Sequence, residues 1–491
     1  MGTARHMVTR PSRRGRRADA GPPAVPEPDS GDRWGHAVVI GAGFTGLLAA
    51  RVLAGRFARV TLLERDRLAP GTTHRSGLPQ GRHPHGLLAR GAAIVEELFP
   101  GIRAELAGRG APVFDFGAGF ATRLPHGWAP RGALGVEVQS LDLTTLESAL
   151  CDRIRAEPAV RIRDGFLAQA LELSADRSRA VAVTGRDRDD PGHTPVRIDA
   201  DLIVDATGRA SRLPGWLAAA GLPRPQRRRV ASPLVYSSRM YELPNHAAPE
   251  WLVSFEMTFP PLVRRGGAAV TVDRGHRLVS VIAPAGELPP PRAEAALREF
   301  AGTLHNPHFA HVMEHGRPVT PVYRCPVGGN QWIRYHRLRR FPDRLLVLGD
   351  AFCAFNPVYG QGLTVAALQA HLLGLLLRRA DDPAGVARRF QRQAARIVLF
   401  PWLTATAADQ GWSRTGPGPA LSCVRAFLHL VVRRVPGDPA LYAEFARVQN
   451  MLASPLRLLR PSLLIRLLRP RGTAAAGAPP GLDEAAGHSP G

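Results

Sequence analysis

Short apolar runs alternate with an amphipathic segment near the start of the chain. Residues 36–40 (HAVVI) and 60–64 (VTLLE) have the length and apolar character of buried strands, and residues 44–56 between them have helical spacing. This order predicts a β-α-β unit. The same kind of pattern predicts three further elements of this domain: a helix over 144–155 and strands over 202–205 and 344–348.

The pattern changes between residues 230 and 332. Four runs in this region (RVASPLVYSSRMYEL, WLVSFEMTF, AAVTVDRG and HRLVSVIA) are typical of successive antiparallel strands, and a helix follows the prolines at 289–291. Residues 382–469 have a mostly helical pattern. We therefore predict an α/β fold with an α+β insert and appended helices.

We assign the chain to the following parts: a discontinuous dinucleotide-binding domain over 36–95, 141–225 and 335–390; an inserted antiparallel-sheet domain over 96–140 and 226–334; a helical C-terminal region over 391–471; and disordered tails over 1–35 and 472–491.

Composition adds little to this fold but excludes some functions. The chain has 491 residues, of which 45% are hydrophobic, enough to form a sizeable core. The formal net charge is +23 and every basic residue is arginine, which is typical of a GC-rich genome. Six arginines lie within the first 17 residues, but no aromatic residue interleaves with them and no nucleic-acid motif follows. We therefore predict a solvated tail and no nucleic-acid partner.

Cysteine and histidine usage indicates neither disulfides nor a metal. Four cysteines lie far apart and form no CxxC pair: Cys151, Cys325, Cys353 and Cys423. This favours a reducing cytoplasm. The N-terminal arginine pairs precede no apolar segment, and no apolar run reaches the ~20 residues of a membrane span. The histidines of 305–315 have helical spacing, but no cysteine accompanies them, so we predict a surface helix there.

The first motif that carries chemistry is GAGFTG at residues 41–46. It directly follows a predicted strand and opens a predicted helix, where glycines permit a tight turn and close approach of a pyrophosphate to the helix N-terminus. Glu64 ends the next strand, where a carboxylate can accept the hydroxyls of an adenosine ribose. A second GxG at residues 117–119 has Thr122 in place of the third glycine, so we predict one bound dinucleotide.

Two further motifs follow later strands. In DATGRAS, a strand delivers Asp205 into a Thr-Gly turn that is followed by Arg209. In GDAFCAFNPVYGQG, a buried strand places Asp350 at its end, and the chain then enters a helix through residues 360–362. A strand-end carboxylate suits a sugar-like hydroxyl, and a helix N-terminus suits negative charge.

Taken together, GAGFTG with Glu64, DATGRAS and GDAFCAFNPVYGQG resemble the FAD-dependent monooxygenases of the para-hydroxybenzoate hydroxylase fold, over about residues 36–390. LPQGRHPHGLLARG (78–91), YSSRMYELP (236–244) and the third motif are similar to the actinobacterial epoxidases that act on polyene precursors of polyether antibiotics. The resemblance implies a Rossmann-like FAD-binding domain of the glutathione-reductase-2 (GR2) type with an inserted substrate domain.

The resemblance also implies roles for individual residues. The glycines of the first motif would hold the pyrophosphate, Glu64 the adenosine ribose and Asp350 the ribityl chain. The backbone of 360–362 would face the flavin N1–C2=O edge, and Gln361, Gly362 and Arg82 would be the catalytic residues. The implied cofactor-binding residues are Gly41, Gly43, Phe44, Thr45, Gly46, Glu64, Arg65, Arg82, His83, Asp205, Gly349, Asp350, Pro357, Gly360, Gln361 and Gly362.

The chain departs from this family at the helix near residue 145. Relatives usually begin this helix with Ser-Arg before a Leu-Glu pair, whereas here Asp142-Leu143 precedes Leu146-Glu147. A cofactor-contacting arginine is therefore absent from this position.

The reaction that the resemblance implies is oxygenation. NAD(P)H would reduce FAD, and a flavin C4a-hydroperoxide would deliver oxygen to an alkene of a polyketide or polyene, with no metal. An aromatic hydroxylase and a flavin-dependent reductase of prenyl chains are the alternatives. A halogenase of the tryptophan type would need an active-site lysine and a WxWxIP signature, and the chain has neither.

The predicted partner is a hydrophobic small molecule, free or bound to a carrier. Its pocket would be lined by aromatic and sulfur-containing side chains of the inserted sheet, namely Phe116, Phe120, Tyr236, Phe255 and Met257. Residues 454–471 (SPLRLLRPSLLIRLLRPR) are basic and apolar, so they could contact an anionic membrane or a carrier protein, but prolines interrupt the helix. We favour a C-terminal helix packed on the FAD-binding domain.

Overall fold

The computed structural model describes residues 33–68, 79–272, 275–289, 293–413, 418–468 and 479–480. Apart from 33–35 and 479–480, the two predicted tails lie outside these ranges. Residues 34 and 35 belong to the first strand, so the N-terminal tail was predicted to end slightly too late.

The centre of the fold is a five-stranded parallel sheet in the order β20-β11-β1-β2-β7. Its central strands β1, β11 and β20 are buried on both faces, which explains their apolar runs; Ala37, Val38 and Val39 are fully buried in the middle of the sheet. The strand bounds are β1 Trp34–Ile40, β2 Phe57–Leu63, β7 Val160–Arg163, β11 Leu202–Asp205 and β20 Leu345–Val347.

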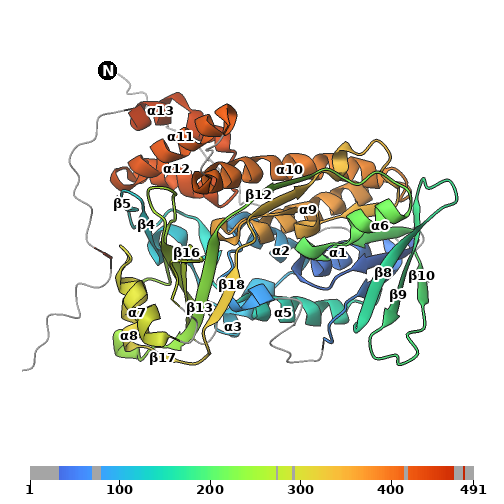
Figure 1. Ribbon diagram of the computed structural model, residues 1–491, viewed down its shortest axis with the longest axis horizontal. Helices are drawn as coiled ribbons and strands as arrows, with labels where there is room; N and C mark the ends of the chain where they lie inside the picture. The colour runs from blue at the N-terminus through green and yellow to red at the C-terminus, as the bar shows by residue number, and fades with distance from the viewer. Residues whose placement is uncertain are drawn as a thin grey trace, which may run out of the picture.

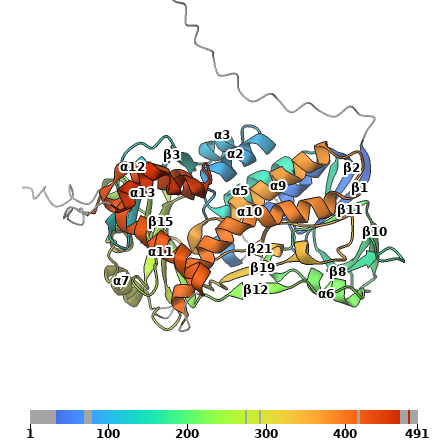
Figure 2. The same cartoon turned by 90° about the horizontal axis from the view of Figure 1, so that it is seen from above.

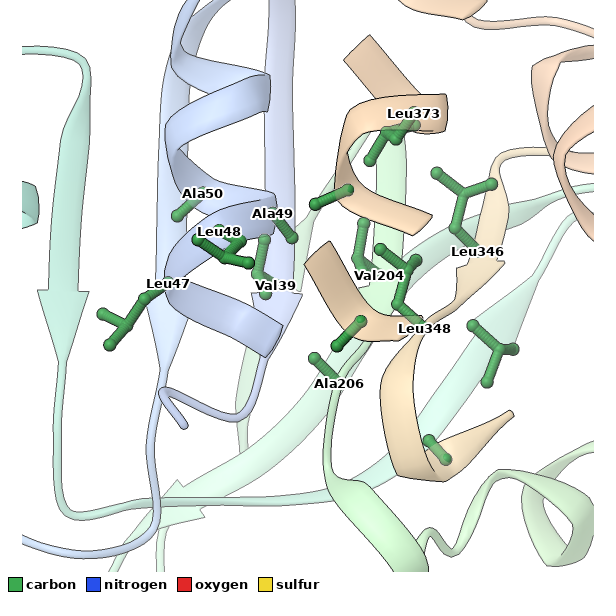
Figure 3. Close-up of a cluster of buried hydrophobic side chains, with 14 of the residues drawn as sticks. Val39, Leu47, Leu48, Ala49, Ala50, Val204, Ala206, Leu346, Leu348 and Leu373 are labelled. Carbon is green, nitrogen blue, oxygen red and sulfur yellow. The ribbon is translucent and has the colours of Figure 1, made fainter. Parts of the chain in front are cut away.

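Helices cover this sheet and complete its core. Leu48 of α1 and Leu373 of α9 belong to the same buried cluster as Val204 and Leu346 of the strands (Figure 3). The view from above shows α9 and α10 lying side by side across the sheet (Figure 2). The helices packed in this part are α1 Phe44–Ala54, α2 Ala89–Leu98, α3 Ile102–Gly108, α5 Leu143–Arg155, α6 Leu213–Ala219, α9 Gly362–Arg378 and α10 Val386–Asp409.

A second, larger sheet lies at the other end of the molecule (Figure 1). Its strands run in the order β17-β13-β16-β15-β14-β4-β5, and β18 also pairs with β13. We predicted an antiparallel sheet, but β14 pairs parallel with β4, because β4 arrives from the earlier segment rather than through a hairpin. The bounds are β4 Phe120–Leu124, β5 Gly127–Trp128, β13 Leu234–Glu242, β14 Val253–Glu256, β15 Gly266–Thr271, β16 Arg277–Pro284, β17 Arg317–Pro318 and β18 Tyr323–Pro326.

Three small sheets connect or flank these two. An antiparallel meander, β8-β9-β10, extends the part that holds the parallel sheet, and β12-β19-β21 joins the inserted region to the third motif. Strands β3 and β6 form an antiparallel pair. Helices α7 and α8 pack on the large sheet, and α4 lies beside β3. The bounds are β3 Val113–Asp115, β6 Glu137–Gln139, β8 Phe166–Leu173, β9 Ala180–Asp187, β10 Val196–Asp199, β12 Arg227–Val230, β19 Asn330–Ile333, β21 Cys353–Ala354, α4 Phe116–Gly119, α7 Glu294–Gly302 and α8 His308–His315.

The last helices form a cap above β4 and β5 (Figure 1). They are α11 Pro419–Arg434, α12 Pro439–Gln449 and α13 Pro461–Leu468. Leu463 and Leu467 of α13 are buried in a cluster with Phe116 and Leu124 of the inserted domain. The same cluster includes Ala89 of α2, within the predicted FAD-binding domain, so the packing of this segment on that domain stays a prediction. Its other side stays exposed, with Leu468 74% accessible, so contact with a membrane or a carrier stays a prediction.

The architecture confirms the predicted fold class: a Rossmann-like sheet, an inserted sheet domain and C-terminal helices. Two predicted boundaries differ. Ile102 and Leu106 of α3 belong to the core of the parallel sheet. The inserted domain therefore begins after α3 and not at residue 96, as predicted. Helix α10 runs through the predicted boundary at 390/391, because Phe390 and Ala394 on one face of it share that same core.

The histidine-rich segment forms α8, but it is not wholly a surface helix. His308 is fully buried, with its Nδ1 2.7 Å from the Ser254 hydroxyl, because α8 packs on the large sheet. Burial lowers the pKa of His308 to about 4. Within the described ranges no group of three or more His, Cys, Asp or Glu side chains is arranged to hold a metal, and no helix is long and apolar enough to cross a bilayer.

Candidate functional site

The turn from β1 into α1 forms the first wall of the site. Gly41 has a φ of +99°, and a Cβ there would lie 2.7 Å from the Ala206 carbonyl oxygen. A Cβ on Gly46 would lie 1.8 Å from the carbonyl oxygen of Gly41. These two glycines therefore let helix α1 begin directly against the strand.

We expect Gly46→Ala to destabilise the protein by about 3 kcal/mol, because the new methyl group meets backbone that cannot move aside. Gly55→Ala, at the other end of α1, is the control: its Cβ would meet only the Val52 carbonyl oxygen, at an ordinary 3.5 Å. Thermal unfolding checks both variants. A Gly46→Ala protein that melts at the wild-type temperature would contradict this packing role.

The N-terminus of α1 faces the site. Its N-cap residue, Gly43, has no side chain that could cap the helix. Two carboxylates approach it instead. Glu64 Oε2 accepts a hydrogen bond from the Ala42 N–H at 2.8 Å, and Glu147 Oε1 accepts one from the Phe44 N–H at 2.8 Å. The positive end of the helix dipole stabilises both charges.

The DATGRAS turn is held by its own aspartate. Asp205 is buried and accepts hydrogen bonds from the Thr207 N–H at 3.0 Å, the Thr207 hydroxyl at 2.5 Å and the Ser211 hydroxyl at 2.5 Å. Burial raises the pKa of Asp205, and the two hydroxyls oppose this effect. Asp205 therefore shapes the turn and does not itself line the cavity, whereas Ala206 and Thr207 do.

The third motif crosses from β20 to α9. Gly349 has a φ of +61° and donates its N–H to Gln369 Oε1 at 2.7 Å. Asp350 follows, with a pKa that burial raises and that nearby Arg209 lowers. Gly360, with a φ of +64°, turns the chain into α9, which begins at Gly362 with no side-chain cap.

These three motifs surround one cavity of about 470 Å³ at the carboxyl ends of the parallel strands. This volume and position are those of a ligand site in an open α/β sheet. Ten of the predicted cofactor residues line it: Gly41, Gly43, Phe44, Thr45, Glu64, Arg65, Asp350, Pro357, Gly360 and Gly362. Six others lie outside its lining: Gly46, Arg82, His83, Asp205, Gly349 and Gln361.

Arg82 and His83 contact the large sheet instead of the cavity. The Arg82 guanidinium lies 4.3 Å from the centre of the Tyr323 ring, and His83 Nδ1 lies 2.7 Å from the Ser238 hydroxyl. Burial lowers the pKa of His83 to about 4, so this imidazole is neutral at pH 7. The predicted cofactor roles of these two side chains are thus not supported by where they lie.

The same loop does reach the cavity through Pro84, His85 and Gly86. His85 Nδ1 lies 2.8 Å from the His83 carbonyl oxygen. Because a carbonyl can only accept, Nδ1 carries the proton of the neutral ring and Nε2 is left as an acceptor. Burial lowers the pKa of His85, which favours this neutral form. The QGRHPHG sequence signalled the loop, but it did not show which histidine would line the site.

The family model for FAD-dependent oxidoreductases matches residues 36–376, which include all three motifs. The chain belongs to this family. The oxidoreductase is also 30% identical to protein Rv3254 of Mycobacterium tuberculosis (strain ATCC 25618 / H37Rv) over 397 residues, which are 76% of this chain and 80% of that protein.

Solved structures share the fold of this oxidoreductase at low sequence identity. A flavoprotein/dehydrogenase from Cytophaga hutchinsonii has a TM-score of 0.61 at 15% identity, covering 87% of this chain and 96% of that one. PqsL of Pseudomonas aeruginosa, described as a probable FAD-dependent monooxygenase, has 0.58 at 18%, covering 78% and 99%. The flavin-dependent brominase Bmp2 has 0.61 at 12%, covering 84% and 93%.

The residues of the cavity fit FAD, the cofactor of this family. The glycine turn into the N-terminus of α1, with extended Gly43 at the N-cap, suits a pyrophosphate, and the Glu64 carboxylate suits a ribose. Asp350 and the N-terminus of α9 also line the cavity. The departure at residue 142 has a structural explanation, because Asp142 caps α5 by accepting from the Thr145 N–H at 2.9 Å.

Several lining residues of the oxidoreductase had no local sequence signal. Helix α5 contributes Leu143 and Glu147, β8 contributes 166–168, and α6 contributes Trp216. Their elements were predicted in part, but nothing in their sequence indicated which side chains would face a ligand. Arg209 also lines the cavity; its Nη1 and Nη2 donate to the Gly328 and Phe355 carbonyl oxygens at 3.0 and 2.9 Å.

The five predicted substrate residues do not form one wall. The rings of Phe116 and Phe120 are tilted by 32° with their centres 4.4 Å apart, and Met257 packs against the same cluster. Tyr236 is buried in a separate cluster, with its ring centre 5.8 Å from that of His83. None of the five, Phe255 included, belongs to the lining of the cavity described above. Their contact with substrate stays a prediction.

Proposed function

We propose that this oxidoreductase is a single-component FAD-dependent monooxygenase that uses NAD(P)H and O2. Its proposed substrate is a hydrophobic polyketide or polyene natural product, of which it epoxidises an alkene. The family match and the shared fold support an FAD enzyme, and the motif resemblance to polyene epoxidases supports the reaction.

One observation carries this proposal. The cavity extends from the N-terminus of α1 to the N-terminus of α9, so that two helix dipoles point their positive ends into one elongated site. The first suits the negative pyrophosphate. The second, at Gly360 and Gly362, suits negative charge that develops on the flavin ring when it is reduced.

FAD, when bound, supplies the redox and oxygen chemistry. The chain binds and orients it: Glu64 would accept the ribose hydroxyls, and Asp350 would accept those of the ribityl chain. Gly360 turns the chain so that the N–H of Gly362, at the start of α9, would stabilise the reduced ring, with Gln361 between them. The walls of the cavity would exclude water from the reacting atoms.

The substrate would approach from the large sheet, where the predicted aromatic side chains lie. NAD(P)H would dock transiently, because the described residues contain one βαβ unit with the GxGxxG turn and FAD fills it. A hydrophobic substrate agrees with the apolar packing of Phe116, Phe120 and Met257 beneath the C-terminal helices.

Oxygen consumption tests this function. The purified protein is expected to be yellow and to contain noncovalent FAD. With NADPH or NADH and a polyene that carries trisubstituted alkenes, we expect substrate-dependent oxygen uptake and a product that has gained one oxygen atom as an epoxide. A phenol and a geranylgeranyl chain are the comparison substrates.

Each outcome separates the alternatives. Oxygen uptake with the phenol alone would favour an aromatic hydroxylase. Saturation of the prenyl chain without oxygen uptake would favour a reductase. A colourless protein that cannot be reconstituted with FAD would contradict the whole assignment.

A further inference from the structure

A buried carboxylate from helix α10 contacts the loop 355–360, which leads into α9 and lines part of the cavity. Asp409 is the last residue of α10 and is 1% exposed. Its oxygens accept three side-chain donors: Asn330 Nδ2 at 2.6 Å, Asn356 Nδ2 at 2.9 Å and the Tyr359 hydroxyl at 2.9 Å. A buried charge is tolerated only with such compensation.

Two of these donors belong to the loop that leads into α9. Asn356 and Tyr359 point to Asp409, whereas Phe355, Pro357 and Gly360 line the cavity. The loop therefore turns Phe355, Pro357 and Gly360 toward the cavity. Asn356 and Tyr359, on its other side, bind the Asp409 carboxylate, which holds the loop in place.

Asn330, which lies far from both Asp409 and the loop in the sequence, forms hydrogen bonds to Asp409 and to Asn356. It begins β19, and its Oδ1 accepts the Asn356 N–H at 2.9 Å while its Nδ2 donates to Asp409. Asn356 Oδ1 in turn accepts the Val358 N–H at 3.1 Å. Each amide is thereby fixed in one orientation, because acceptors and donors would clash if either were reversed.

We propose that Asp409 is a positioning residue for the cofactor: its carboxylate holds Asn356 and Tyr359 so that the loop 355–360 and the N-terminus of α9 face the flavin. This inference rests on the proposed binding of FAD in the cavity. Asp409 is not part of the cavity lining and acts through the loop. Burial raises the pKa of Asp409 to about 6, against the effect of its three donors, so it is ionised at pH 8.

The experiment uses Asp409→Asn at pH 8. The new amide keeps the size of the side chain but carries no charge and offers one acceptor oxygen to three donors in place of two, so the loop is held less firmly. We expect the Kd for FAD, measured by fluorescence titration of the apoprotein, to rise about tenfold or more. We also expect the midpoint potential of the bound flavin to become more negative, because the α9 N-terminus no longer aligns with the reduced ring.

The rescue variant is the double substitution Asn330→Asp with Asp409→Asn. It exchanges donor and acceptor across the same contact: the new carboxylate at position 330 would still accept the Asn356 N–H and would also accept from the new amide at position 409. We expect FAD binding within about fourfold of wild type. A role in folding stability alone would not predict recovery of the midpoint potential.

The matched control is Val398→Ala, a fully buried position on the same helix that faces the core of the parallel sheet. It should lower the melting temperature and leave the Kd for FAD unchanged. If Asp409→Asn fails to fold, Tyr359→Phe removes one donor and should weaken FAD binding about threefold to tenfold.

Unchanged FAD affinity and potential in Asp409→Asn, or in Tyr359→Phe where that variant replaces it, would overturn the proposal. Failure of the double variant to restore binding would do so as well. Either result leaves the FAD assignment intact, since that assignment depends on whether the wild-type protein binds FAD at all.

Discussion

Asp350→Ala is expected to purify without flavin. Asp350 lies in the turn that follows β20, where its carboxylate lines the cavity and would accept hydroxyls of the ribityl chain. Loss of one charge-assisted hydrogen bond costs ~1.5–3 kcal/mol, so the Kd for FAD should rise about 10- to 150-fold. Titration of the apoprotein with FAD at pH 8 measures this change.

The control for this loss is Glu299→Ala, which removes a carboxylate from the exposed face of α7, far along the chain from the site. It should bind FAD as the wild type does. Asp350→Asn, which keeps one acceptor oxygen, should fall between the wild type and Asp350→Ala. Full flavin occupancy in Asp350→Ala would show that another group holds the ribityl chain.

Gly43→Asp is expected to weaken FAD binding while the apoprotein keeps its fold. Gly43 is the N-cap of α1, where aspartate is among the favoured residues, and a Cβ there meets only Glu147 Oε1, at 3.5 Å. The new carboxylate also lies beside Glu147, and this repulsion opposes the capping gain, so the apoprotein should stay folded and melt about 4 °C lower. The new carboxylate would stand where the pyrophosphate binds, and like charges in contact cost several kcal/mol, so FAD should bind about a hundredfold more weakly.

Gly43→Asn supplies the neutral comparison, since asparagine has nearly the same size and is an equally good N-cap. It should bind FAD more tightly than Gly43→Asp. Equal Kd values for the two variants would mean that steric bulk, and not charge, governs binding at this turn. Thermal unfolding of both apoproteins checks that the fold is retained.

The three cofactor motifs show why part of the site could be predicted from the sequence. Gly41 directly follows β1, Asp350 follows β20 within three residues, and Gly360 lies two residues before α9. Turns so close to a strand end or a helix start leave a short, contiguous signature. Because the carboxyl ends of parallel strands meet at one edge of a sheet, three signatures that follow three such strands predict one shared cavity. The structure brings them to that cavity.

The positions of Arg82, His83 and His85 could not be predicted from the sequence in the same way. They lie within four residues of each other, yet only His85 lines the cavity, because the loop turns its neighbours toward Tyr323 and Ser238 of the large sheet. Sequence spacing does not specify the direction of side chains in an irregular loop, since no helical or strand period applies there.

The sequence by itself determined the parallel-sheet unit, its FAD-type motifs and the inserted sheet, because hydrophobic period and glycine turns are local properties of the chain. Only the tertiary structure decided that Leu463 and Leu467 of α13 share a buried cluster with Phe116 and Ala89. It also decided that Asp409 meets Asn330, Asn356 and Tyr359. Such contacts join residues far apart in sequence. They have no local pattern, because they exist only once separate elements have packed and buried polar groups must find partners.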